Sequence, residues 1–168
     1  MTPFTITHAA PASADLNSLL DLCFGPGRLA RTAERLRESN RPIADYSHHA
    51  HDETRLLGAI SFWPIAIAET PGLLLGPLAV HPDMQGRGLG LALMQTALEK
   101  IDAARFDFIL LVGDLPYYQR AGFQVAPSGV RLPGPVDPER LLVRPSHADK
   151  TAICAALSGA VRPTPEMC

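Results

Sequence analysis

The chain has 168 residues, of which 46% are hydrophobic, and carries a formal net charge of −2 at pH 7. This length suits a single domain over residues 1–168, and the composition is typical of globular chains. No apolar run is long enough to span a membrane and no signal-like segment opens the chain, so we expect no membrane partner and a cytoplasmic location. Three widely spaced cysteines favour neither a disulfide framework nor a zinc site. The slightly acidic balance argues against a nucleic-acid partner.

The first 40 residues predict one strand and two helices. Residues 4–8 read as a strand, and the apolar spacing over 12–22 predicts a helix that Ser13 is able to cap. A second helix is predicted over 29–39. The basic cluster within it, at 27–37, reads as a solvated helix face rather than a nucleic-acid patch.

Three consecutive strands follow. Residues 46–51 and 56–67 are rich in strand formers and flank the turn "DETR", which indicates an antiparallel hairpin. The turn "ETPG" at 69–72 leads into a third strand over 73–80. The sequence therefore predicts a meander.

The second half alternates helices and strands. A helix is predicted from Gly88, and its apolar stripe consists of Leu91, Met94, Leu98 and Ile101. The nearly continuous apolar run 106–112 is typical of a strand buried on both faces. A short helical piece at 117–122 and weaker strands at 123–126 and 141–144 complete a core over 4–145, and the tail 146–168 is expected to be helical and then mobile. The fold class is α/β, a mixed sheet with helices packed on it.

A glycine-rich turn separates the strand that ends near Val80 from the helix. Gly86, Gly88 and Gly90 leave the first backbone N–H groups of that helix uncovered, which favours an anion such as phosphate, and Arg87 adds a cation. A tight turn alone would need only one glycine. A Walker loop would require Lys-Ser/Thr after the glycines, and the dinucleotide fingerprint would require a third glycine where Leu91 stands.

Two motifs resemble a third kind of loop. "LAVHPDMQGRGLG" contains Gln85-Gly86-Arg87-Gly88-Leu89-Gly90, which resembles the Gln/Arg-x-x-Gly-x-Gly/Ala signature of the Gcn5-related N-acetyltransferases (GNAT family). Downstream, "FDFILLVGDLPYYQRAGF" is similar to the family's next strand and its Tyr-x-x-x-Gly-Phe segment, here Tyr118 to Phe123. The form of this second motif resembles the YhbS-like branch of predicted acetyltransferases. The resemblance covers about residues 56–125.

The resemblance implies a mostly antiparallel sheet with a splayed parallel pair and acetyl-CoA as cosubstrate, without a metal. The pantetheine arm would lie in the splay and the pyrophosphate at the glycine turn, with Arg87 near a CoA phosphate. Gly76-Pro77 suits an interrupted strand beside the arm, because proline cannot donate to a ladder. The implied cofactor-binding residues are Leu78, Ala79, Val80, Gln85, Gly86, Arg87, Gly88, Leu89, Gly90 and Leu91.

The resemblance also implies direct attack of a primary amine on the thioester in a ternary complex. The oxyanion donor would be a backbone N–H near Val80, and Tyr118, four residues before Gly122, would be the catalytic residue that protonates the departing thiolate. Tyr117 is the alternative donor, and a mere packing role for both tyrosines stays open. The family's asparagine is replaced by Leu111 here.

The general base is left open among His81, Glu69 and Glu53. The histidines at 48, 49 and 51 read as part of a solvated strand, because no further ligand completes a metal site.

The acceptor, a small-molecule or protein amine, would meet the helices over 12–38 and the C-terminal strands. An exposed sheet edge often pairs in this family, which allows a homodimer. Two other functions stay open at this point: a non-catalytic acyl-CoA sensor and, less favoured, a nucleotide hydrolase.

Overall fold

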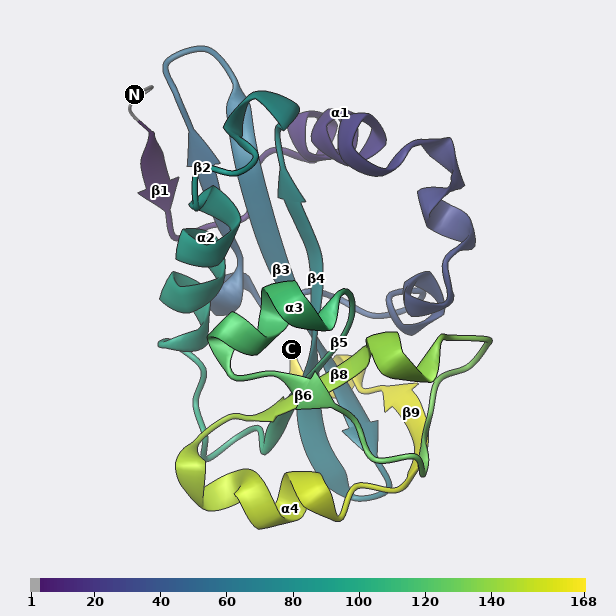
Figure 1. Ribbon diagram of the computed structural model, residues 1–168. Helices are drawn as coiled ribbons and strands as arrows, with labels where there is room; N and C mark the ends of the chain where they lie inside the picture. The colour runs from purple at the N-terminus through teal and green to yellow at the C-terminus, as the bar shows by residue number, and fades with distance from the viewer. Residues whose placement is uncertain (1–3) are drawn as a thin grey trace.

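The computed structural model describes residues 4–168, and within them the chain forms a nine-stranded mixed sheet flanked by helices (Figure 1). The strand order is β1-β2-β3-β4-β5-β8-β6, and β9 pairs with both β3 and β7. The strands are β1 (Thr5–Thr7), β2 (His48–His51), β3 (Leu56–Ile67), β4 (Thr70–Val80), β5 (Phe108–Val112), β6 (Gln124–Val125), β7 (Val130–Arg131), β8 (Leu141–Pro145) and β9 (Gly159–Pro163).

Four α-helices and several 3₁₀ turns connect these strands. The helices are α1 (Ser13–Phe24), α2 (Leu89–Leu98), α3 (Leu115–Tyr118) and α4 (Thr151–Ala155). The 3₁₀ turns are η1 (Pro26–Ala30), η2 (Thr32–Leu36), η3 (Ala44–Tyr46), η4 (Pro82–Met84), η5 (Gln119–Ala121), η6 (Pro138–Arg140), η7 (Ala148–Lys150) and η8 (Pro165–Met167). No helix in this part of the chain is long and apolar enough to cross a bilayer.

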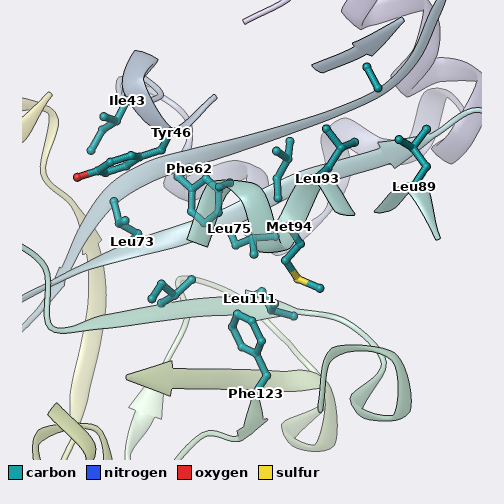
Figure 2. Packing of buried hydrophobic residues seen from close by; sticks show 14 of the residues in the cluster. Ile43, Tyr46, Phe62, Leu73, Leu75, Leu89, Leu93, Met94, Leu111 and Phe123 are labelled. Carbon is teal, nitrogen blue, oxygen red and sulfur yellow. The ribbon is translucent and has the colours of Figure 1, made fainter. Parts of the chain in front are cut away.

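The two long strands β3 and β4 carry helices on opposite faces. On one face α1 packs Leu19 and Leu20 against Ala59 and Ala79. On the other face α2 packs against a larger cluster that contains Phe62 (Figure 2). Alternate residues of a strand point to opposite faces, so both faces of these strands need apolar side chains.

Strand β5 is buried on both faces, as predicted. Phe108 and Leu110 join the cluster beneath α4, whereas Ile109 and Leu111 join the cluster beneath α2. The strand is parallel to β4 and antiparallel to β8. The mixed α/β sheet and its splayed parallel pair are therefore confirmed.

Two local predictions are wrong and a third is incomplete. The helix expected over 29–39 is two 3₁₀ turns, because Arg31 between them has extended dihedrals (φ −71°, ψ 144°). Ser13 does not cap α1, since it is the first helical residue, and Ala12 at the N-cap has no side-chain acceptor. In the predicted stripe of α2, Met94 is buried and Leu91, Leu98 and Ile101 are half-buried against the core, but the prediction missed the buried residues Leu89, Gly90, Leu93 and Ala97.

The tail contains a strand that the sequence did not predict. Residues Gly159–Pro163, in the stretch expected to be mobile, form β9, and Ile65, Ala66 and Ile67 of β3 pair with it. Val161 is buried in the cluster beneath α4. The C-terminal segment thus closes the sheet against its longest strand.

Candidate active site

The two parallel strands β4 and β5 separate at the centre of the sheet. Their pairing covers only Gly72–Leu74 against Phe108–Leu110. Beyond Leu74 the β3–β4 register shifts in a bulge opposite Ile60 and Phe62, and the Trp63 indole N–H donates to the Gly76 carbonyl at 2.6 Å. The backbone of β4 from Leu75 onward therefore has β3 on one side and a gap on the other.

The gap belongs to a cavity of about 700 Å³. Its walls are the bulged part of β4, the end of β5 and the start of α3, closed by the segment that contains η1 and η2 and by residues 135–137. Figure 1 shows the η1–η2 segment bowing away from the sheet after α1. A space of this size is typical of small-molecule sites.

The hydrogen-bond pattern decides which backbone groups face the gap. His81 N–H donates to the Leu57 carbonyl at 2.8 Å, so Val80 and Gly58 form a non-hydrogen-bonded antiparallel pair. The N–H and C=O of Val80, and by alternation those of Leu78, consequently point away from β3. Those of Ala79 point toward β3, and the Val80 carbonyl accepts a hydrogen bond from Cys23 Sγ at 3.3 Å. Among the three predicted pantetheine contacts, the free outward groups are therefore the N–H and C=O of Leu78 and the N–H of Val80.

The glycine turn presents a row of unpaired N–H groups. Helix α2 begins after Gly88, which has left-handed dihedrals (φ 81°) and provides no side-chain cap. Intrahelical bonding starts only at Ala92, whose N–H donates to the Gly88 carbonyl, so the N–H groups of Leu89, Gly90 and Leu91 have no helical partner. Together with the helix dipole, these groups make an anion-binding site.

A second cavity, of about 340 Å³, lies against this turn. Gln85, Gly86, Gly88, Leu89, Gly90 and Leu91 line it, as do Val80, Met84, Tyr117 and Arg120. The predicted cation Arg87 is exposed and does not line it. The arginine that does line the cavity is Arg120, from η5. Arg120 is part of the motif "YYQRAGF", but only the folded chain brings it close to the glycine turn, so nothing in the sequence indicated this contact.

Gly90 also has a packing role beside the predicted contribution of its N–H group. A Cβ on Gly90 would collide with the Tyr117 hydroxyl, and it would lie 3.2 Å from Val80 Cγ2. The absence of a side chain at Gly90 therefore makes room for Tyr117. Because Tyr117 lines both cavities, it stands at their boundary.

Tyr118 is more deeply placed than Tyr117. Its ring packs edge-on against Phe123 and lies so close to Gly113 that a Cβ there would collide with it. It lines the larger cavity. Burial is the main cause that raises the pKa of Tyr118 to about 12, and burial also raises the pKa of Tyr117. Both phenols are consequently neutral at physiological pH.

The position of the family's asparagine offers no polar group. Leu111 is buried in the core beneath α2. Asp114 lines the larger cavity, but its carboxylate accepts a hydrogen bond from Arg140 Nε at 3.1 Å.

None of the three general-base candidates lines either cavity. Glu69 lies in the β3–β4 turn, ten residues before Ala79 and thus at the opposite end of β4. Glu53 lies in the β2–β3 turn, and His81 Nδ1 accepts a hydrogen bond from the Asp83 N–H. The carboxylates that do line the larger cavity are Glu34, Asp114 and Asp137. No sequence pattern singled out Glu34 or Asp137, because the irregular loops around them fold there only in the complete structure.

The basic segment at 27–37 is not a solvated helix face. Arg28, Arg31, Glu34 and Arg37 all line the larger cavity. Arg37 pairs with Glu34, and its guanidinium carbon lies 6.0 Å from the Trp63 ring centroid. Burial lowers the pKa of Arg37. This segment is therefore a wall of the site.

The histidines of β2 do not form a metal centre. Within residues 4–168 no group of three or more His, Cys, Asp or Glu side chains is placed to hold a metal ion. His48 is fully buried rather than solvated, and His8 contacts it edge-on with ring centroids 4.6 Å apart.

Comparison with known proteins agrees with this geometry. Residues 44–125 match the family model described as an acetyltransferase (GNAT) domain. The splayed parallel strands and the amide-lined turn at the start of α2 lie within or beside this range. This part of the chain is thus similar to GNAT acetyltransferase domains, and the homologues support an acyltransferase activity.

Individual relatives are similar to this chain over most of its length. An uncharacterized N-acetyltransferase of Escherichia coli K12, YjhQ, is 29% identical over 136 residues, which are 79% of this chain and 75% of the relative. The E. coli GNAT protein YhbS, solved in complex with CoA, superposes with a TM-score of 0.77 over 98% of this chain and 91% of its own, at 22% identity. A Brucella melitensis GNAT acetyltransferase, solved with acetyl-CoA, has a TM-score of 0.59 at 25% identity, covering 88% of this chain and 98% of its own.

Proposed function

We propose that the protein transfers an acetyl group from acetyl-CoA to a primary amine by direct attack in a ternary complex. The observation that carries the proposal is the continuity between two backbone surfaces. The outward N–H and C=O groups of Leu78 and the outward N–H of Val80 border the gap, and the unpaired N–H groups of α2 begin a few residues later. An amide-bearing arm that ends in a diphosphate matches both surfaces in that order.

The residues present fit such a cosubstrate. The outward backbone groups of Leu78 would pair with the amides of the pantetheine arm, as an added strand does at a sheet edge, while the Val80 N–H faces the thioester. The N–H groups of Gly88 to Leu91 would bind the diphosphate, with Arg120 supplying a positive charge beside them. The bound thioester supplies the acetyl group and a thiolate leaving group.

The outward N–H of Val80 is the proposed donor to the oxyanion that forms on the thioester carbonyl. It is held in place because the next residue, His81, is bonded to β3. Cys23 Sγ donates to the Val80 carbonyl at 3.3 Å, which further restricts this peptide. Backbone donors fixed in this way need no reorganisation during the reaction.

Tyr118 is the proposed partner of the departing thiolate. With a phenol pKa of about 12 against about 8.5 for a free thiol, full proton transfer to the sulfur is uphill. Tyr118 would therefore act mainly as a hydrogen-bond donor that stays neutral. Tyr117, at the boundary of the two cavities, would help to close the site around the cosubstrate.

The test is calorimetric titration with acetyl-CoA followed by thiol release in the presence of amines. Binding with release of CoA only when an amine is present supports the proposal. Binding without turnover across a broad set of amines would instead favour a sensor that holds an acyl-CoA. If neither acetyl-CoA nor CoA binds, the proposed function is wrong.

The two tyrosines form a matched pair of variants. Tyr118→Phe is expected to lower kcat about 100-fold or more while changing the Kd for acetyl-CoA less than twofold, as befits a donor that acts in the transition state. Tyr117→Phe is expected to lower kcat by much less. The reverse order of effects would assign the donor role to Tyr117.

A further inference from the structure

One wall of the larger cavity concentrates positive charge. Arg28, Arg31 and Arg37, from the segment that contains η1 and η2, all line it, and we call these three residues the basic wall. Two carboxylates neutralise it in part. Asp21 accepts from Arg28 Nε at 2.8 Å, and Glu34 pairs with Arg37. Three guanidinium groups thus face two carboxylates.

Arg31 holds the charge that is left over. Among residues 4–168 it has no carboxylate within ion-pair distance. Its guanidinium carbon lies 5.1 Å from the Phe24 ring centroid, which also lines the cavity. The group is exposed and oriented by an aromatic face while its hydrogen-bond donors stay free.

Arg37, on the same wall, has a hydrogen-bond donor without a partner. Its Nε is buried and has no hydrogen-bond partner in the described chain. The pKa of Arg37 is lowered first by burial, and the neighbouring charges of Arg31 and Arg28 lower it further. These guanidinium groups are therefore close enough to repel one another. A cavity with mutually repelling cations is stabilised by an anion.

The chemistry of guanidinium groups narrows the choice of anion. Arginine binds carboxylate and phosphate oxygens through paired, planar hydrogen bonds. Leu78 and Tyr118, proposed to lie beside the thioester, line the same cavity as the basic wall. A molecule bound to Arg31 would thus occupy the space next to the reacting carbonyl.

We propose that the acceptor is a small primary amine that carries its own oxyanion, a carboxylate or a phosphate, and that Arg31 binds this oxyanion. The inference rests on the proposed acetyl transfer and names its substrate class. Polyamines carry no oxyanion that could pair with Arg31, so we expect them to be poorer acceptors.

The experiment compares amines that differ only in the anion. Ethanolamine is paired with O-phosphoethanolamine, and an amino acid is paired with its amide, with spermidine as a polycation. The oxyanion member of at least one pair is expected to have a kcat/KM at least tenfold higher than its neutral partner. A preference for O-phosphoethanolamine over ethanolamine would indicate phosphate recognition, and a preference for the amino acid over its amide would indicate carboxylate recognition. Better use of the neutral partners or of spermidine would overturn the inference while leaving the acetyl transfer intact.

A variant and its control locate the effect. Arg31→Gln should raise the KM for the oxyanion amine about tenfold or more, leave the neutral partner within twofold and leave the KM for acetyl-CoA unchanged. Arg35→Gln is the control, because Arg35 is an exposed arginine of η2 that does not line the cavity. Equal effects of the two variants would contradict a role for Arg31.

A binding measurement distinguishes failure of the proposed acetyl transfer from failure of the proposed oxyanion recognition by Arg31. CoA-loaded protein is titrated calorimetrically with the same amine pairs. Preferential binding of the oxyanion amine, lost in Arg31→Gln, supports the inference even without turnover. Binding of CoA with no preference within any pair contradicts it. Failure of CoA itself to bind contradicts the proposed function.

Discussion

The Tyr117 hydroxyl lies against the backbone of Gly90, at the first turn of α2, so closely that no side chain fits between them. This contact joins two parts of the candidate site, the glycine turn and the α3 segment, and the two residues are 27 positions apart in the sequence. It predicts that the two residues are energetically coupled.

Gly90→Ala is therefore expected to weaken acetyl-CoA binding at least tenfold, because the methyl group displaces Tyr117. Tyr117→Phe should restore much of the loss, since the next ring atom, Cζ, would be 3.7 Å from the new Cβ. A double-mutant cycle of Kd values measures the coupling. Additive effects would refute it.

Trp63 is predicted to hold the bulge of β4. Its indole N–H donates to the Gly76 carbonyl, and Trp63→Phe leaves that carbonyl without its donor. We expect a loss of about 1–3 kcal/mol in the free energy of unfolding, measured with denaturant, and a rise in the Kd for acetyl-CoA because the gap is less well defined. Unchanged stability together with unchanged affinity would show that the bulge does not depend on this bond.

The C-terminal strand β9 is predicted to contribute to stability. Val161 is 5% exposed and packs in the cluster beneath α4. Val161→Ala should lower the free energy of unfolding by about 2 kcal/mol, from lost burial and the cavity left behind. Arg162→Ala, at an exposed position of the same strand, is the control and should change it by less than about 0.5 kcal/mol. Equal effects would mean that β9 does not pack as described.

His48 is predicted to make the protein sensitive to acid. Its ring is fully buried, neither ring nitrogen has a hydrogen-bond partner in the described chain, and burial lowers its pKa below 6.5. The unfolded chain then binds a proton more readily than the folded one, so the stability present above pH 6.5 falls as the pH drops through the folded pKa.

His48→Leu should reduce the loss of unfolding free energy between pH 7 and pH 5. The matched control is His147→Gln, since His147 is 67% exposed at its side chain. Denaturant titrations at both pH values provide the measurement. An unchanged pH dependence in His48→Leu would assign the acid sensitivity to other groups.

Much of the sheet could be predicted from the sequence because its signals are local. The apolar run around Leu110 and the turn residues around "DETR" fix strand type and hairpin position within a few residues. The glycines before α2 likewise mark a helix start with free N–H groups. The amide-lined turn was therefore recognisable from the sequence, whereas the position of Arg120 in the cavity beside it, where Arg87 was expected, was not.

The acceptor side could not be predicted in the same way. Residues 29–39 have helical spacing, but an extended Arg31 breaks them into two turns that wrap around the cavity. The environment of Glu34 and Arg37 depends on Trp63 and on the bulge, which are distant in sequence. Strand β9 pairs with β3 across almost 100 residues, and its short, proline-flanked sequence has no periodicity to reveal it.

The strands around the gap are held together at one end only. The parallel contact of Gly72–Leu74 with Phe108–Leu110 and the return of β9 onto Ile65–Ile67 both lie toward the same end of the long strands. At the other end, Leu78 of β4 and Val112 of β5 share no backbone hydrogen bond. The width of the gap between β4 and β5 is thus fixed from its paired end, so substitutions at that end should alter the width without touching any residue that lines the gap.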